Sequence, residues 1–239
     1  MGRDVALLAR ARETGEAVFS IYEWARPTLS FGRNQLARDH YDPAAIRNAG
    51  FDVVRRPTGG RALLHHREVT YSVAARAASS SLRDSYDRIN RILLHGLSAL
   101  GVNAEIASNG ITSPPGPVPC FADPAPGELI AGGRKLVGSA QWREDGALLQ
   151  HGSILVDNDQ VVIPSLMTSN HREEVPPAAA TLSSILGRQV GAAEVASGVF
   201  AAVRELEDES AEPLEEEEVR ADALSQARSF ENELWTWRR

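Results

Sequence analysis

The stretch Arg55-Arg56-Pro57-Thr58-Gly59-Gly60-Arg61-Ala62-Leu63-Leu64-His65-His66 decides the fold of this chain. It lies between an apolar run at residues 51–54 and an alternating run at residues 68–73, and both runs are typical of β-strands. A glycine pair allows positive φ angles and lets a ligand come close to the main chain. The stretch is therefore either a turn with solvated arginines or a turn that binds a ligand. The rest of the chain favours the second interpretation.

Composition limits the classes of protein to which the chain can belong. It has 239 residues, of which 43% are hydrophobic, enough for one large core. The formal net charge of −7 argues against nucleic acid as a partner, and no apolar run approaches the roughly 20 residues of a membrane span. A single cysteine excludes an internal disulfide and indicates a reducing compartment. Because the first residues also lack signal-peptide features, we expect a cytoplasmic monomer without membrane partners.

The hydrophobic pattern predicts an α+β fold, with a mixed, largely antiparallel sheet flanked by helices. Strands are expected at residues 17–24, 28–32, 51–54, 68–73, 102–106, 128–130, 135–142 and 147–156. Helices are expected at residues 4–15, 43–48, 85–100, 181–186, 192–204 and 214–235, with a proline-rich loop at residues 107–119. Asp4 is expected to cap the first helix and Gly15 to end it. We expect a single domain, 1–239, in which residues 181–239 form a helical C-terminal portion.

Three polar residues attract attention as possible carriers of chemistry. Cys120 is the side chain with the strongest intrinsic nucleophilicity. Lys135 is the only lysine, and its use where arginine is otherwise preferred suggests that a compact ammonium is needed. His151 lies in an otherwise apolar strand. From these residues alone, a cysteine that fills a gap, a solvated lysine and a structural histidine remain alternatives. No spacing of His and Cys fits a metal site, and we expect none.

Four motifs, in order, carry a resemblance to a known superfamily. Residues 55–65 resemble the signature of the biotin/lipoate protein ligase and octanoyltransferase superfamily. Residues 133–141 resemble its lysine motif, residues 149–154 the strand that follows, and residues 27–35 an earlier motif. The resemblance implies the biotin/lipoate ligase catalytic-domain fold and Cys120 and Lys135 as catalytic residues. The substrate-binding residues that it implies are Arg55, Arg56, Thr58, Gly59, Gly60, Arg61, His65, Gly138, Ser139, Ala140, Gln141, His151 and Gly152.

Cys120 distinguishes between the branches of this superfamily. Lipoate ligases use ATP and need no cysteine, whereas octanoyltransferases use a cysteine thiolate and an acyl thioester. Residues 119–124, followed by Glu128, resemble the cysteine motif of the LipM-type octanoyltransferases, in which the cysteine precedes the lysine. In the LipB type the cysteine follows the lysine, and no cysteine follows Lys135 here. The resemblance therefore implies octanoyl transfer from acyl carrier protein through Cys120, without a cofactor, to a lysine of a lipoyl domain or glycine-cleavage H protein.

This resemblance carries expectations about mechanism. An ammonium at Lys135 would favour the Cys120 thiolate, and Lys135 or a backbone N–H near Cys120 would hold the oxyanion. Either Lys135 or His151 would take a proton from the acceptor lysine. Arg55, Arg56 and Arg61 would orient a phosphate of the carrier or of a nucleotide. The expected acyl tunnel is lined by Leu63, Val73 and Val137, and a basic docking face is expected at Arg3, Arg10, Arg12, Arg33, Arg38 and Arg61.

Two other functions remain open, and some residues depart from the family pattern. One alternative is a lipoate or octanoate ligase that uses ATP and magnesium, with Cys120 incidental. The other is a degenerate member that binds lipoyl domains without chemistry. His66 stands where the family usually has aspartate, and Pro126-Gly127 replaces an aromatic residue. The chain begins inside what is normally the first helix of the family, so we expect an N-terminal strand to be absent, which would affect the sheet edge.

Overall fold

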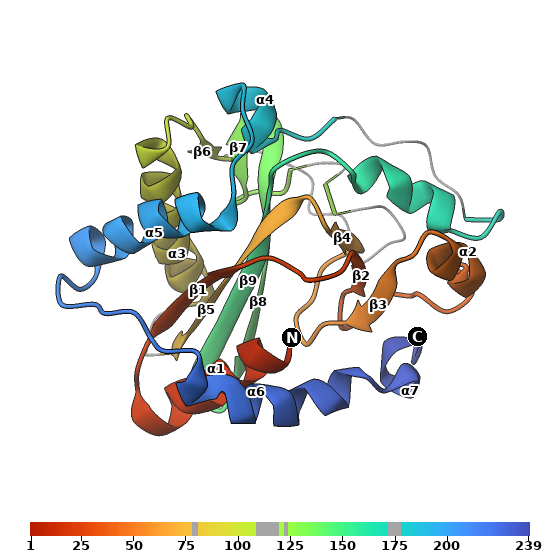
Figure 1. Ribbon diagram of the computed structural model, residues 1–239, viewed down its shortest axis with the longest axis horizontal. Helices are drawn as coiled ribbons and strands as arrows, with labels where there is room; N and C mark the ends of the chain where they lie inside the picture. Colours follow the sequence, from red (N-terminus) through yellow and green to blue (C-terminus); the bar gives the residue numbers. More distant parts are fainter. Residues whose placement is uncertain (78–80, 109–119, 122–123, 172–177) are drawn as a thin grey trace.

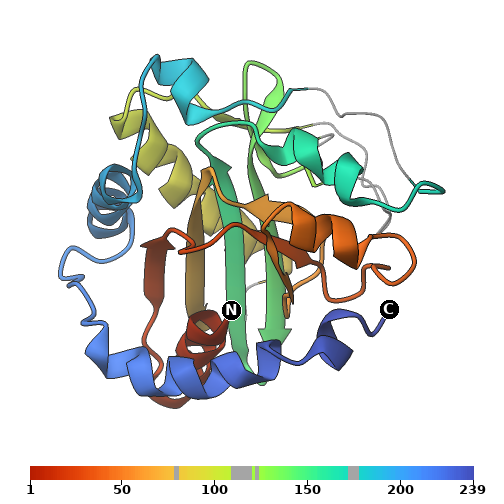
Figure 2. The same cartoon turned by 45° about the vertical axis from the view of Figure 1, so that its right-hand side comes forward.

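The computed structural model describes residues 1–77, 81–108, 120–121, 124–171 and 178–239, and it contains two sheets (Figures 1 and 2). The larger sheet has the strand order β1-β5-β9-β8-β7-β6 and the smaller one the order β3-β2-β4. All neighbouring strands pair antiparallel except β2 and β3. The predicted α+β fold with a mixed, largely antiparallel sheet is thus confirmed. The strands are β1 (Val18–Tyr22), β2 (Thr28–Phe31), β3 (Asp52–Arg55), β4 (Leu63–His65), β5 (Glu68–Arg76), β6 (Glu105–Ile106), β7 (Leu129–Ala131), β8 (Arg134–Glu144) and β9 (Ala147–Leu155).

Helices cover both faces of the larger sheet (Figure 1). Along β5, Val73 packs in the cluster that includes residues of α3 and α5, whereas its neighbour Ala74 packs against Leu7 and Ala11 of α1. Because successive side chains of a strand point to opposite faces, α3 with α5 and α1 with α6 lie on opposite sides. The helices are α1 (Gly2–Thr14), α2 (Pro43–Asn48), α3 (Leu82–Ala99), α4 (Leu182–Leu186), α5 (Ala192–Leu206), α6 (Glu217–Phe230) and α7 (Glu233–Thr236), with a 3₁₀ helix η1 (Gln160–Leu166).

Local sequence signals explain most of these boundaries. α3 begins at Leu82, before the expected residue 85, because Ser81 and Asp84 form a capping box. Gly15 ends α1 with a φ of 82°, as predicted. Asp4 does not cap that helix, because it lies inside the first turn and is completely buried. The expected final helix at residues 214–235 is two helices, since Asn232 caps a new start at α7.

Two elements were not predicted, and one expected segment lies outside the described residues. β4 has only three residues, too few to show a hydrophobic period, and η1 contains a proline. β6 is shorter than the expected strand at residues 102–106. Residues 109–119 of the proline-rich loop are among those not described. Among the helices of the described ranges, none is long and apolar enough to cross a membrane.

The smaller sheet holds the C-terminal tail through Arg55, which is completely buried. Its guanidinium donates to the carbonyl oxygens of Thr236 at 2.8 Å, Gly32 at 2.6 Å and Gln35 at 2.8 Å. Trp235 returns a bond from its indole N–H to the carbonyl oxygen of Arg55 at 2.9 Å. The expectation that Arg55 orients a substrate phosphate is therefore wrong, because its donors are directed into the protein at main-chain oxygens.

Candidate active site

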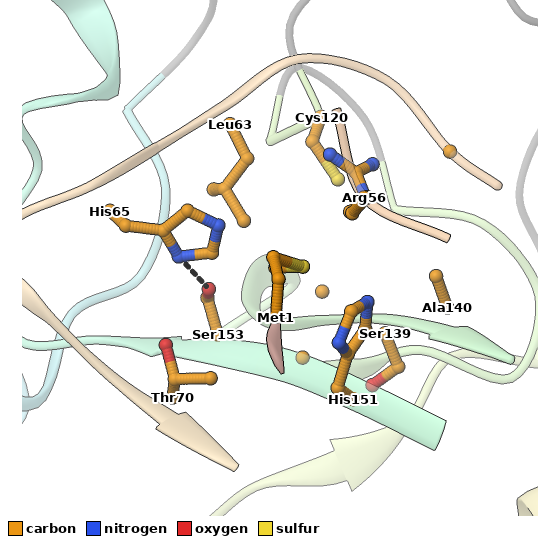
Figure 3. Close-up of a pocket in the computed structure, with 13 residues that line it drawn as sticks. Met1, Arg56, Leu63, His65, Thr70, Cys120, Ser139, Ala140, His151 and Ser153 are labelled. Atoms are coloured by element: carbon orange, nitrogen blue, oxygen red, sulfur yellow. Dashed lines mark hydrogen bonds between the residues drawn. The ribbon is translucent and has the colours of Figure 1, made fainter. Parts of the chain in front are cut away.

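A pocket lies where the two sheets meet (Figure 3). We call one side the β8–β9 wall, and it consists of Gly138, Ser139, Ala140, His151, Gly152 and Ser153. We call the other side the Gly-pair wall, and it consists of Arg56, Gly60, Leu63 and His65. Cys120, Met1 and Thr70 complete the lining. The two motifs that the sequence singled out, residues 55–65 and 133–141, are therefore brought together around one space that also contains the cysteine.

Cys120 is held between the two walls by its own main chain. Its backbone N–H donates to the carbonyl oxygen of Ala62 at 3.0 Å, next to the Gly-pair wall. Its carbonyl oxygen accepts a bond of 2.7 Å from the Lys135 ammonium, which belongs to β8. The same ammonium lies 3.5 Å from the Cys120 sulfur. The N–H of Cys120 itself is therefore occupied and is not a free donor for an oxyanion, which leaves Lys135 or another backbone N–H near Cys120 for that expected role.

Lys135 is not a solvated lysine, since only 3% of it is exposed. Its ammonium donates to Glu128 at 2.6 Å and lies 5.0 Å from the centre of the Phe121 ring. Glu128 also accepts a bond of 2.8 Å from the backbone N–H of Ala125, so both carboxylate oxygens are used. This arrangement fixes a single ammonium beside the sulfur. Glu128 was quoted in the cysteine motif but not expected as a site residue.

Arg56 lies in the Gly-pair wall and stabilises the turn by hydrogen bonds to its main chain. Its guanidinium donates to the carbonyl oxygens of Gly59 at 3.1 Å, Arg61 at 2.7 Å and Ser30 at 3.1 Å. Burial lowers the pKa of Arg56 to about 10, although the charge of the nearby Cys120 acts in the opposite direction. Arg56 therefore remains charged at neutral pH and adds a second cation near the sulfur. Its bonds to the main chain do not support the expected contact with a phosphate.

His151 connects the β8–β9 wall to both α1 and the Gly-pair turn. Its Nδ1 lies 3.2 Å from the Asp4 carboxylate, and its Nε2 lies 2.6 Å from the Thr58 hydroxyl. Burial lowers the pKa of His151 more strongly than Asp4 raises it, so the ring is neutral at neutral pH. Burial would raise the pKa of Asp4, but the amino group of Met1 and the bond to His151 outweigh it and hold this pKa well below its ordinary value. Asp4 is thus an ionised acceptor.

His65 forms a second array of the same type on the facing wall. Its Nδ1 lies 3.0 Å from Glu68 and its Nε2 lies 2.9 Å from the Ser30 hydroxyl. The ring stacks on Trp24 with the centroids 4.3 Å apart, and Ser30 also accepts a bond of 3.0 Å from Arg56. Its Nδ1 also lies 3.5 Å from the Ser153 hydroxyl of the β8–β9 wall (Figure 3). Both ring nitrogens of His65 therefore already contact buried partners, and Ser30 is held in addition by Arg56.

Two glycines of the site are required by close packing. A Cβ at Gly152 would lie 2.3 Å from the carbonyl oxygen of Gly138 and 2.6 Å from the Tyr71 ring. A Cβ at Gly138 would lie 3.2 Å from Lys135 Cε and 3.4 Å from the Cys120 sulfur. A side chain at residue 138 would therefore be tight against Lys135 and the Phe121 ring, 3.2 Å away, and in ordinary van der Waals contact with the Cys120 sulfur.

The remaining predicted residues lie at varying distances from this pocket. Leu63 lines it as expected, but Val73 and Val137 belong to the main core under α3 and α5. Gln141 donates to Gln150 at 3.2 Å and does not line the pocket. Gly59 borders open space, since a Cβ there would have no atom within 4 Å. The carbonyl oxygen of Arg61 accepts a hydrogen bond from Arg56.

His66 and the possible metal ligands complete the survey of the site. His66, which replaces the usual aspartate, lies 3.1 Å from Asp159 at the surface. The pocket residues that the sequence analysis missed are Met1, Thr70 and Ser153, together with the buried Asp4 behind His151. In the part of the chain that the structure describes, no group of three or more His, Cys, Asp or Glu residues could hold a metal ion.

The fold is that of the catalytic domains of lipoate–protein ligases. The structure of lipoate-protein ligase A bound with ATP superposes with a TM-score of 0.76 at 21% identity, over 99% of this chain and 92% of that one. The bipartite lipoate protein ligase of the Thermoplasma acidophilum lipoylation system gives 0.76 at 18% identity, over 99% and 89%. At the level of sequence, residues 1–204 match the lipoyl protein ligase A/B catalytic domain, and the chain belongs to this family.

Curated relatives confirm the predicted superfamily. Octanoyltransferase LipM of Symbiobacterium thermophilum is 40% identical over 215 residues, which are 82% of this chain and 77% of that protein. Octanoyltransferase LipM of Carboxydothermus hydrogenoformans is 43% identical over 164 residues, 66% of this chain but only 61% of that protein. The chain thus spans less than two thirds of the length of this second relative.

Proposed function

We propose that this protein is an octanoyltransferase that moves an octanoyl group from acyl carrier protein, through a thioester on Cys120, to a lysine of a lipoyl domain or of glycine-cleavage H protein. The relatives named octanoyltransferase support the reaction class. The observation that carries the proposal is that Cys120 lines the pocket and that its sulfur lies 3.5 Å from the buried Lys135 ammonium. An ammonium beside a cysteine favours the thiolate, which is the nucleophilic form.

The first half-reaction uses this pair directly. The Cys120 thiolate attacks the carbonyl carbon of the donor thioester, a new carbon–sulfur bond forms, and the donor thiol leaves. Two N–H groups of Lys135 are held by Glu128 and by the carbonyl oxygen of Cys120. The third faces the sulfur and can follow the negative charge as it moves to the carbonyl oxygen. One such donor contributes about 3 kcal/mol to catalysis.

The proposed reaction needs neither ATP nor a metal ion. The energy of the donor thioester is retained in the Cys120 thioester, so the acyl group stays activated without adenylation. ATP and magnesium would be required only if the protein were a ligase. In that case Cys120 would not carry the acyl group, and the two reactions are distinguished by the experiment below.

We place the docking face for the acidic carrier and acceptor domains near the Gly-pair turn. Of the expected cations, Arg3, Arg10 and Arg12 of α1 are paired with acidic residues of α6 and of neighbouring loops. By contrast, a second group makes no ion pair with any aspartate or glutamate of the described residues. We call this group the arginine surface, and it consists of Arg33, Arg38, Arg61, Arg238 and Arg239. Unpaired cations attract an acidic partner in an otherwise acidic protein.

The test is to incubate the protein with octanoyl-acyl carrier protein, without ATP, and to measure its intact mass. An adduct of one octanoyl group that is absent from Cys120→Ser supports the proposal. Addition of a lipoyl domain should then remove the adduct and acylate the domain. If modification of the domain requires ATP and no adduct forms, the protein is a ligase. If neither product forms, the result supports the third alternative, a protein that binds lipoyl domains without chemistry.

A further inference from the structure

In the array of Asp4, His151 and Thr58, the charge states of Asp4 and His151 determine which atom donates and which accepts each hydrogen bond. Asp4 is ionised and therefore only accepts hydrogen bonds, so the 3.2 Å contact requires a proton on Nδ1 of His151. The ring is neutral, so its Nε2 carries a lone pair and accepts the Thr58 hydroxyl at 2.6 Å. The buried carboxylate thereby fixes the tautomer in which Nε2 is basic.

This basic nitrogen belongs to a ring that lines the pocket containing Cys120 (Figure 3). Asp4 is completely buried behind it, and His151 is 5% exposed. The two histidines differ in the partner at Nε2. For His65 this partner is Ser30, whose hydroxyl also accepts a hydrogen bond from Arg56. Thr58 has no comparable second side-chain bond among the described contacts, so an incoming amine can replace its hydroxyl at Nε2.

We infer that His151, positioned by Asp4, is the general base that deprotonates the acceptor lysine in the second half-reaction. This inference rests on the proposed function. The alternative base, Lys135, already donates its protons to Glu128 and to Cys120, and an ammonium cannot accept another proton. His151, by contrast, has a lone pair on Nε2 that can accept a proton. The Asp4 carboxylate at Nδ1 can stabilise the imidazolium that forms.

The step balances in atoms and charge. The lysine ammonium gives one proton to Nε2 of His151, and Asp4 stabilises the imidazolium that forms. The neutral amine attacks the thioester carbonyl, the carbon–nitrogen bond forms, and the carbon–sulfur bond to Cys120 breaks. The second proton from nitrogen goes to the departing sulfur. The products are the acylated lysine, the Cys120 thiol and a protonated His151, which then loses its proton to water.

Two acyl acceptors of different chemistry can distinguish a general-base role of His151 from a purely structural one. A lipoyl-domain lysine is an ammonium at neutral pH and needs a base. Hydroxylamine is already an uncharged nucleophile and does not. The enzyme is first loaded with octanoyl-acyl carrier protein, and the decay of the adduct is then followed by intact mass after addition of either acceptor. The variants are Asp4→Asn, His151→Gln and, as a matched control, His95→Gln, which removes a histidine that pairs with a carboxylate, Glu205, outside the pocket.

We expect Asp4→Asn and His151→Gln to load at a normal rate and to transfer to the lysine at least about tenfold more slowly, the lower range for loss of a general base. Transfer to hydroxylamine should change little, and the control His95→Gln should resemble the parent in every assay. Asparagine can donate to Nδ1 and so move the ring proton to Nε2, which explains the expected loss in Asp4→Asn.

Three outcomes would overturn the inference. One is normal transfer to the lysine by His151→Gln. Another is an equal loss with lysine and with hydroxylamine, which would show that the array only maintains the pocket. The third is failure of both variants to fold or load, which has the same meaning. If the parent protein never loads, the proposed function itself is wrong. If the parent loads and His151→Gln transfers normally, only this inference is wrong.

Discussion

The two walls of the pocket differ in what their polar side chains contact. In the Gly-pair wall, Arg56 gives its donors to main-chain oxygens and to Ser30, and its neighbour Arg55 holds the C-terminal tail. On the other side, Lys135 and His151 contact reactive or movable groups, namely the Cys120 sulfur and the Thr58 hydroxyl. The stretch that makes the family recognisable is therefore scaffold. The groups suited to chemistry belong to β8, β9 and the residues that touch them.

Cys120 and Thr58 connect the two walls across the pocket. Cys120 bonds to Ala62 on one side and to Lys135 on the other, and Thr58 of the turn bonds to His151 of β9. A change in the Gly-pair stretch should therefore affect the free energy of unfolding of the protein. A change in β8, β9 or the residues that touch them should affect the rate of acyl loading. The predictions that follow test this division.

The largest effect is expected from Lys135→Met, which removes the ammonium beside the sulfur. Acyl loading of Cys120 should fall by about 10²-fold or more, the usual effect of losing one oxyanion donor. Because Glu128 would be left buried without its partner, the double variant Lys135→Met/Glu128→Gln serves as the control for folding. Rapid loading by a folded Lys135→Met protein would contradict the role given to the Lys135 ammonium beside the Cys120 sulfur.

The next effect concerns stability, and it is expected from Arg55→Met. The variant leaves the carbonyl oxygens of Thr236, Gly32 and Gln35 without the donors that they have now. We expect a loss of about 2–3 kcal/mol in the free energy of unfolding, as for buried groups that lose a charged partner. Denaturant unfolding measures this, and loading per folded molecule should stay normal. A slow but fully stable variant would reverse the assignment of the walls.

Gly138→Ala should give an intermediate effect, because the added Cβ would be tight against Lys135 Cε and the Phe121 ring, which flank the Cys120 sulfur. The neighbours must shift by a few tenths of an ångström, and such shifts cost about 1–3 kcal/mol in a packed site. Loading should slow by about tenfold, since misplacement of catalytic groups is costly. An alanine variant with the parental rate would show that the sulfur and the ammonium tolerate displacement.

The smallest effect is expected from charge reversal on the arginine surface. Arg33→Glu should raise the KM for octanoyl-acyl carrier protein a few-fold and leave octanoyl transfer from a small thioester unchanged, because a surface charge acts mainly on encounter. Arg10→Glu is the matched control, since Arg10 is already paired with Glu16 and Glu218. Equal effects of the two reversals would remove the docking role of the arginine surface.

Much of the scaffold could be predicted from the sequence because its signals are local. The spacing of Ile89, Leu93 and Leu97 is that of a buried helix face, and these residues are buried in α3. Gly15 ended α1 as expected. β4 was not found, since three residues between a glycine turn and a longer strand leave no period to recognise.

The candidate site was predicted less completely, because its contacts join distant parts of the chain. Asp4 and His151 are 147 residues apart, and nothing in helix 4–15 indicates a carboxylate that is buried against a histidine. The charge of Arg55 suggested a phosphate, but its burial at the junction with the C-terminal tail depends on a partner 181 residues away. Only the resemblance to a family joined Cys120 to Lys135, and even that left Glu128 without a role.

The identity of residue 135 has a consequence for the rest of the surface. Lys135 is the only lysine of the chain and is 3% exposed, so every other long cationic side chain is an arginine. A guanidinium stays protonated and does not attack thioesters as an amine does. If Cys120 carries the acyl group as proposed, this sequence offers no surface lysine for self-acylation, and the acyl group would be kept for the amine of another protein.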